Sequence, residues 1–227
     1  MLDPISWGDA GPWYMAALFG GYLLGSIPFG LLFTRMAGLG DIRDIGSGNI
    51  GATNALRTGN KTVAIGTLIF DALKGGLALF IAGEVGGPDL AVLAAIGAML
   101  GHCYPVWLKF KGGKGVSTFL GILWFTAWPI AIATCLTWLV VAALSRMSSL
   151  SALVAAALTP IYFYMAGAFK GGATAWMQDL YSANDWQWAQ ATLVLVIVVY
   201  IRHQENIGRL IRGEEPKIGA KKDEEQA

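Results

Sequence analysis

Polar residues that suit phosphate binding gather between Asp41 and Asn54, where three glycines alternate with hydroxyl and amide side chains. Glycine permits left-handed backbone angles and lets N–H groups approach a ligand closely. Successive N–H groups in such a loop form an anion-binding concavity, and an arginine can pair with phosphate through two parallel hydrogen bonds. The candidate ligands here are Ser47, Asn49, Thr53, Asn54 and Arg57. The alternative is a flexible turn with helix caps, but fourteen residues are more than a turn needs.

A second stretch places glycines and a lysine directly before a predicted helix, in the order Gly112, Gly113, Lys114 and Gly115. Backbone N–H groups and the positive end of a helix then meet at one point, which favours an anion. The G-x-x-x-x-G-K-[ST] spacing of an ATP-binding loop is absent. The alternative is a basic loop that only fixes the orientation in a membrane, for which the glycines are not needed.

A third polar group closes the last apolar segment, where His203 and Asn206 lie three residues apart. If the helix continues, these two side chains share a face, and Arg202 neighbours Asn206 one turn away. Histidine titrates near neutrality and can donate or accept a proton. A polar cap on the last helix is the alternative.

Asp71 and Lys74 lie one helical turn apart inside an apolar segment. Charged side chains at membrane depth are costly unless they are paired or face a polar interior. The spacing therefore predicts an ion pair that faces the other helices, with either a structural or a functional role.

The composition identifies the environment in which these groups must be positioned. The 227 residues are 55% hydrophobic and 14% charged, with a mean hydropathy of +0.54, whereas soluble domains are about 25% charged. A water-soluble surface is thereby excluded. Cys103 and Cys135 lack metal-ligand spacing, so we expect two buried thiols and no metal or other cofactor.

Hydropathy and helix breakers predict an all-α integral membrane protein with about seven transmembrane helices. Two of these are short and flank Pro129, and this pair is expected to form a hairpin that need not span fully. Gly21-x-x-x-Gly25 and Gly97-x-x-x-Gly101 indicate close helix packing. The predicted helices are Trp13–Met36, Lys61–Gly83, Leu90–Leu108, Ser117–Trp128, Pro129–Leu144, Ser149–Ala168 and Trp186–Arg202.

The distribution of charge predicts the orientation. With the N-terminus outside and the C-terminus inside, fourteen of the sixteen lysines and arginines fall on the cytoplasmic side. An odd number of crossings follows: seven, or five if the short hairpin is re-entrant. We expect residues 1–212 to form a single membrane domain and residues 213–227 a solvated, disordered charged tail. Lys170–Asp185 is expected as an external amphipathic loop.

Taken together, these segments resemble the bacterial acyl-phosphate:glycerol-3-phosphate acyltransferase family (PlsY). The resemblance runs from about Gly20 to Arg212 in the family's order. It rests on Gly25-Ser26-Ile27-Pro28-Phe29-Gly30, Gly46-Ser47-Gly48-Asn49-Ile50-Gly51-Ala52-Thr53-Asn54, Asp71-Ala72-Leu73-Lys74-Gly75, His102 to Gly115, and Arg202-His203-Gln204-Glu205-Asn206-Ile207.

The resemblance implies transfer of a fatty acyl group from acyl phosphate to the 1-hydroxyl of sn-glycerol 3-phosphate, which gives lysophosphatidic acid and inorganic phosphate, the first acylation of phospholipid synthesis. It implies a bacterial inner-membrane protein with its site at the cytoplasmic face, no cofactor, no nucleic acid and no obligate protein partner. The implied catalytic residues are Ser47, Lys114, His203 and Asn206; the implied substrate-binding residues are Asn49, Thr53, Asn54, Arg57, Gly112, Gly113 and Gly115.

No spacing supports a Ser-His-Asp arrangement, so direct transfer without an acyl-enzyme is preferred. The base is either His203 or an oxygen of a substrate phosphate. The main rival is a transporter for a phosphorylated or anionic solute, which would need polar groups across the whole membrane depth. A phosphotransferase acting on a nucleotide-linked lipid would need more acidic metal ligands than the loops offer. A non-catalytic scaffold leaves the glycine loops unexplained.

Overall fold

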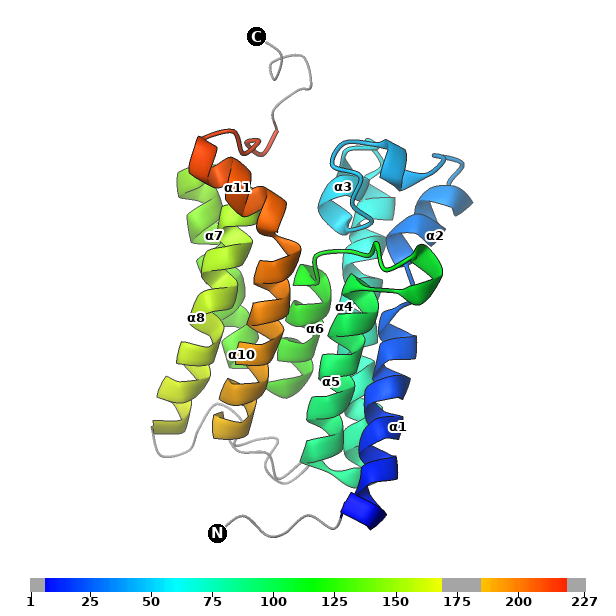
Figure 1. Cartoon of the computed structure of the whole chain (residues 1–227). Coiled ribbons are helices and arrows are strands. Elements are labelled where there is room, and N and C mark those ends of the chain that lie inside the picture. The colour runs from blue at the N-terminus through cyan, green and yellow to red at the C-terminus, as the bar shows by residue number, and fades with distance from the viewer. Residues whose placement is uncertain (1–6, 169–184, 220–227) are drawn as a thin grey trace.

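The computed structural model describes residues 7–168 and 185–219, and within those ranges the regular structure is helical. Residues 169–184, which include most of the expected external loop, and residues 220–227 lie outside the described part of the chain. The helices form an elongated bundle (Figure 1). They are α1 (Trp7–Gly25), α2 (Phe29–Met36), α3 (Ala52–Leu56), α4 (Lys61–Gly86), α5 (Pro88–Cys103), α6 (Val116–Thr126), α7 (Trp128–Ser145), α8 (Ser148–Ala168), α10 (Asp185–Arg202) and α11 (Gln204–Arg212), with 3-10 turns at Ile42–Asp44 and Val106–Leu108.

The first predicted span is broken, because α1 ends at Gly25 and α2 begins at Phe29. Pro28 has no N–H group to continue the helical ladder, and the chain leaves helical geometry there. The break frees two carbonyl oxygens that other elements use. Ser26 accepts a hydrogen bond from Trp107 Nε1 at 2.9 Å, and Ile27 accepts one from Lys74 Nζ at 2.8 Å.

Small residues bring α1 and α5 into backbone contact, as the two glycine pairs indicated. A Cβ atom on Gly21 would lie 2.2 Å from the carbonyl oxygen of Ala94, and one on Gly97 would lie 2.1 Å from that of Leu18. Inside a membrane the hydrophobic effect contributes little to helix association. Close backbone packing of this kind supplies the attraction instead. The α1–α5 contact therefore depends on glycine.

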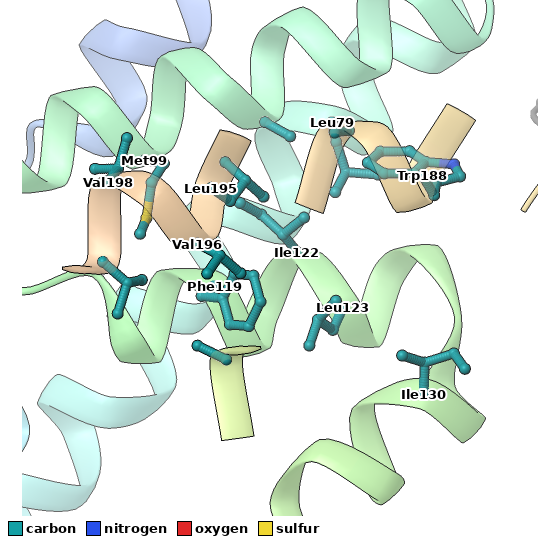
Figure 2. Close-up of a cluster of buried hydrophobic side chains, with 14 of the residues drawn as sticks. Leu79, Met99, Phe119, Ile122, Leu123, Ile130, Trp188, Leu195, Val196 and Val198 are labelled. Carbon is teal, nitrogen blue, oxygen red and sulfur yellow. The ribbon is translucent and has the colours of Figure 1, made fainter. Parts of the chain in front are cut away.

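The apolar core lies between α5, α6, α8 and α10, with α4 and α7 at its edges. Figure 2 shows Phe119 and Ile122 of α6 beside Leu195 and Val196 of α10. Trp188 near the start of α10 is buried in the same cluster. This core packs α6 against α10, and candidate site residues directly precede α6 and directly follow α10.

The helices around Pro129 differ from the prediction that both are short. The break falls at Ala127, and Pro129 lies in the first turn of α7, where a missing N–H costs nothing. Helix α7 has 18 residues and is long enough to cross, whereas α6 has 11 residues, about 16 Å of helix against about 30 Å of hydrocarbon. One of the two is short, not both.

In the described ranges, five helical segments are long and apolar enough to cross a membrane, and α6 and Trp186–Arg202 are shorter apolar helices. The count of seven crossings and the orientation stay predictions. The loops that carry most of the lysines and arginines lie at one end of the bundle with α3 and α11 (Figure 1). Asp89, hydrogen-bonded to Tyr14 and Gln187, belongs to the start of α5 at the other end.

Candidate active site

The segment between α2 and α3 is built around the buried amide of Asn54. Its Nδ2 donates to the carbonyl oxygens of Ile42, Ile45 and Asn49 at 2.8–3.0 Å, and its Oδ1 accepts from the Ser47 backbone N–H at 3.1 Å. The side chain of Asn54 is therefore fully engaged within the loop. The structure shows it holding the loop in shape, where the sequence predicted a substrate ligand.

Gly46 and Gly48 both have positive φ angles, +55° and +68°, which the loop needs in order to fold over α3. A Cβ atom on Gly46 would lie 2.6 Å from Cδ of Arg57, so the arginine side chain crosses directly over this glycine. Ser47 and Thr53 are exposed beside it. Arg57 thus packs over the loop that carries Ser47, and a shared phosphate site for these two residues stays a prediction.

A second loop, residues 104–115, lies between the ends of α5 and α6. It is tied to the α1–α2 segment by two side chains: the Tyr22 hydroxyl donates to the Tyr104 carbonyl oxygen at 2.8 Å, and Trp107 Nε1 donates to the Ser26 carbonyl oxygen. Lys109 and Phe110 both adopt left-handed φ angles, 53° and 61°. This turn sends the chain back toward the end of α5.

Gly112 and Gly113 return onto the last turn of α5. Their N–H groups donate to the carbonyl oxygens of Cys103 and His102, at 3.2 and 3.0 Å. A Cβ atom on Gly113 would lie 2.0 Å from His102 Nε2. These two N–H groups are consequently not available to a phosphate, which corrects the expectation that both glycines cradle one. Glycine is required here because the backbone passes against the His102 ring.

Gly115 has a positive φ of +82° and is the N-cap of α6. A Cβ atom there would lie 2.3 Å from Met99 Cε, so the turn into α6 also needs glycine. Lys114 immediately precedes this cap. Lys114 and the positive end of α6 are therefore adjacent along the chain, and their binding of an anion together stays a prediction.

The last helix does not continue through His203, and this corrects the expected i, i+3 relation on one helix. Helix α10 ends at Arg202, and His203 is the N-cap of α11.

His203 is buried, and its Nδ1 donates to the carbonyl oxygen of Val199 at 2.8 Å. A carbonyl accepts only, so the neutral ring carries its proton on Nδ1 and leaves a lone pair on Nε2. Burial lowers the pKa of His203 from 6.5 to about 4.

Lys114 Nζ donates to Oδ1 of Asn206, and this contact joins the glycine loop to α11. Nδ2 of Asn206 donates in turn to Oε1 of Glu215 at 2.6 Å. Burial lowers the pKa of the Lys114 ammonium, and the charge of Arg209 adds to the effect. The fold thus brings together Lys114, His203 and Asn206. The sequence proposed this group but did not predict the contacts that join its members.

Glu215 was expected in a solvated tail, and for this residue the expectation is wrong. It is buried and accepts hydrogen bonds from Ser149, Asn206 and Arg209 at 2.5–2.8 Å. Burial alone would raise the pKa of its carboxyl group, but these donors outweigh burial and the pKa is lowered. Nothing in the composition of the charged tail separates this glutamate from its neighbours.

Arg202 was placed beside Asn206 in the third polar group, but it was not named among the catalytic or substrate-binding residues. Its guanidinium donates to the carbonyl oxygens of Gly112 and Gly113 and lies 5.1 Å from the ring centre of Tyr104. The signal available in the sequence was its position directly before His203, which positive-inside topology also explains.

Two polar clusters result. One holds Ser47, Asn49, Thr53, Asn54 and Arg57, and the other holds Lys114, His203, Asn206 and Glu215. The 104–115 loop lies between them: Leu108 packs on the apolar cluster beneath α2 and α3, and Gly112 and Gly113 bind Arg202. Among the described residues, no group of three or more His, Cys, Asp or Glu side chains is placed to hold a metal ion.

Comparison with known proteins decides the family. The family model for glycerol-3-phosphate acyltransferase matches residues 15–213. The chain belongs to the glycerol-3-phosphate acyltransferase family. Both polar clusters except Glu215 fall within the matched residues.

Relatives and solved structures of this family cover nearly the whole chain. The glycerol-3-phosphate acyltransferase of Cereibacter sphaeroides is 53% identical over 91% of this chain and 90% of its own, and that of Rhodopseudomonas palustris is 52% identical over 92% and 98%. The crystal structure of PlsY, an integral membrane glycerol 3-phosphate acyltransferase, in its glycerol 3-phosphate form has a TM-score of 0.77 at 31% identity, covering 91% of this chain and 96% of that one. Its lysophosphatidic acid form gives 0.76 at 30%, covering 90% and 94%. This member of the glycerol-3-phosphate acyltransferase family therefore has the fold of an integral membrane protein.

Proposed function

We propose that this protein transfers a fatty acyl group from acyl phosphate to the 1-hydroxyl of sn-glycerol 3-phosphate, releasing lysophosphatidic acid and inorganic phosphate. The related PlsY has been crystallised in a glycerol 3-phosphate form and a lysophosphatidic acid form, which are the acceptor and the product of such a reaction. Both proposed substrates carry phosphate, and the two polar clusters offer a separate cation to each.

The observation that carries the proposal is the position of Lys114. Lys114 immediately precedes the N-cap of α6, and its half-buried ammonium has Asn206 as its partner. A partly desolvated cation beside a helix N-terminus interacts strongly with an anion because little water screens the charge. The second cluster supplies Arg57 over the glycines of the α2–α3 loop, and a guanidinium suits a phosphate through two parallel bonds.

The chemistry asks little of the protein beyond positioning and charge stabilisation. An acyl phosphate is a mixed anhydride with a good leaving group. The 1-hydroxyl oxygen forms a bond to the acyl carbon, the bond from that carbon to the phosphate oxygen breaks, and the hydroxyl proton passes to a base. In this proposal Lys114 and Arg57 stabilise phosphate charge, and Ser47 and Asn49 donate to the carbonyl oxygen as negative charge develops there.

Two candidates for the base stay open. The Nε2 lone pair of His203 is set by the hydrogen bond at Nδ1, although the pKa of about 4 makes this imidazole a weak base. An oxygen of a substrate phosphate is the other candidate. In either case the acyl group passes directly between the substrates, without a covalent acyl-enzyme.

A small apolar cavity adjoins the polar end of the bundle. This cavity of about 20 Å³ lies between α6, α7, α8 and α10, and its lining includes Val116 next to the α6 N-cap and Val199 one turn before His203. We propose that the acyl chain enters from the bilayer between these four helices, while the phosphate of the acyl phosphate stays at the polar end. That end is proposed to face the cytoplasm of a bacterial inner membrane, because it carries the lysines and arginines.

Purified protein in detergent tests the reaction with labelled glycerol 3-phosphate and, in parallel, acyl phosphate, acyl-CoA and acyl-carrier protein. Lysophosphatidic acid should form from acyl phosphate. Absence of product from acyl phosphate, or equal turnover with acyl-CoA, would remove the proposed donor. Protein incubated with acyl phosphate alone should show no added acyl mass, and an acylated species would replace direct transfer by a covalent route.

Lys114→Ala and Arg57→Ala should each lower kcat/KM by about 100-fold or more, the scale of losing one stabilising donor. Lys111→Ala and Lys61→Ala are the matched controls, since both lysines are exposed at the same end of the bundle. Losses as large in the controls would show that general positive charge, not these two residues, supports the reaction.

A further inference from the structure

The peptide of Gly112 and Gly113 is held from two sides by the protein itself. On one side the two N–H groups donate to carbonyl oxygens at the end of α5. On the other side Arg202 Nε donates to the Gly113 carbonyl oxygen at 3.0 Å, and Arg202 Nη2 donates to that of Gly112 at 2.9 Å. Both donors and both acceptors of the glycine pair are thereby bonded within the chain. A segment of glycine, which otherwise has the widest conformational freedom of any residue, is fixed.

Lys114 follows Gly113 directly, so the clamped peptide sets where the lysine backbone begins. From there the side chain reaches Asn206 on α11. Arg202 is the last residue of α10 and stands one residue before His203. The same guanidinium lies 5.1 Å from the ring centre of Tyr104 at the start of the loop. Arg202 consequently fixes the position of the glycine loop relative to the end of α10, directly before His203 and the helix α11 that carries Asn206.

We propose that Arg202 is a positioning residue, which holds Lys114 in its working place through the carbonyl oxygens of Gly112 and Gly113. Its fork-shaped guanidinium is the reason for the residue type, because two adjacent carbonyls are bound at once in a fixed geometry. A lysine at this position would keep the positive charge, but its ammonium would not bind the two carbonyl oxygens in the same fixed geometry. This inference rests on the proposed role of Lys114, and it differs from a role for Arg202 as a phosphate ligand.

A double-variant comparison separates the two roles. Arg202→Ala should lower kcat/KM by about 100-fold, the scale of a misplacement near 1 Å. If Arg202 acts through Lys114, the same change made in a Lys114→Ala background should lower kcat/KM no further. Losses that multiply in the double variant would overturn the proposal, because Arg202 would then contribute on its own.

The variant Arg202→Lys tests whether the two-pronged geometry of the guanidinium is required. Arg202→Lys should keep only a small fraction of the activity, about one tenth or less, despite its retained charge. Activity near that of the unchanged protein would show that charge alone suffices and would contradict the proposal. Arg212→Lys is the matched control, an exposed arginine on α11 that pairs with Glu214, and it should behave like the unchanged protein.

Hydrogen exchange gives a readout that does not depend on turnover. In Arg202→Ala and Arg202→Lys the amides of Gly112 and Gly113 should exchange about tenfold faster, because their clamp is loosened, while amides in the middle of α5 keep their rates. Unchanged exchange at the two glycines would refute the clamp even in an active protein. Faster exchange in a protein that fails every acyl-transfer assay would leave the clamp standing and remove the proposed function instead.

Discussion

At the scale of single residues, the candidate site consists of polar groups that are hydrogen-bonded within the chain itself. Both ends of the Asn54 side-chain amide are hydrogen-bonded within the α2–α3 loop. The amide of Asn206 accepts from Lys114 and donates to Glu215. Groups held this way need little reorganisation when a charged substrate binds. His203 is a further case, since its ring is buried and bonded to Val199.

His203 gives a pH prediction whose sign follows from its pKa of about 4 against 6.5 in the unfolded chain. Between these values the unfolded chain binds a proton that the folded protein does not. Stability is therefore unaffected by His203 above pH 6.5 and falls as the pH drops toward 4, by about 3 kcal/mol in all. Thermal unfolding of the unchanged protein and of His203→Gln between pH 7 and 4 checks this: the Tm of His203→Gln should fall less. Parallel curves would contradict it.

At the scale of elements, a buried charged group connects three helical segments. Lys74 Nζ lies 2.7 Å from Asp71 Oδ1 on α4 and donates to Ile27 in the α1–α2 break, and His102 of α5 lies 3.6 Å from Asp71. The carbonyl oxygen of His102 also accepts from Gly113. The pair thus links the break that precedes the α2–α3 loop to the loop that carries Lys114.

Removing one partner of this pair should be far worse than removing both. Asp71→Ala leaves the Lys74 ammonium buried without its carboxylate, which costs about 3–5 kcal/mol. The double variant Asp71→Leu with Lys74→Met replaces the pair by apolar side chains and should recover a large part of that loss. Apparent Tm in one detergent measures both, with Glu84→Ala at the exposed end of α4 as the control. A double variant less stable than Asp71→Ala would argue against an ion-pair role.

At the scale of the whole molecule, α1, α4 and α5 lie on one side of the bundle and α7, α8 and α10 on the other, with α6 between them (Figure 1). Each side brings one polar cluster to the same end, and the 104–115 loop joins them. Exposed apolar side chains along the helices are the surface expected against lipid. In the proposed function, an acyl chain from the bilayer and a phosphate from water would meet at that end.

The orientation is tested by single cysteines in a protein whose Cys103 and Cys135 are replaced by alanine. Lys111→Cys and Glu84→Cys place exposed thiols at opposite ends of the bundle. A membrane-impermeant maleimide added to intact spheroplasts should label position 84 and should label position 111 only after the membrane is opened. The reverse pattern would invert the proposed topology.

Several features followed from the sequence alone because they depend on local chemistry. Apolar length and the bias of lysine and arginine are properties of segments, so the helices, the membrane class and the gathering of basic loops were predictable. The glycine pairs of α1 and α5 predicted close packing, and the spacing of Asp71 and Lys74 predicted their ion pair. The blocks around Asn49, Lys114 and His203 indicated the family.

Tertiary structure decided the features that depend on partners distant in the chain. The N–H groups of Gly112 and Gly113 are used by the end of α5, and their carbonyl oxygens are used by Arg202, about ninety residues later. Glu215 is buried because Ser149, Asn206 and Arg209 converge on it. A hydrogen bond depends on where both atoms end up in space, whereas a sequence pattern describes neighbours along the chain. The sequence therefore indicated candidate phosphate ligands, and the fold determined which of their polar groups are hydrogen-bonded within the chain.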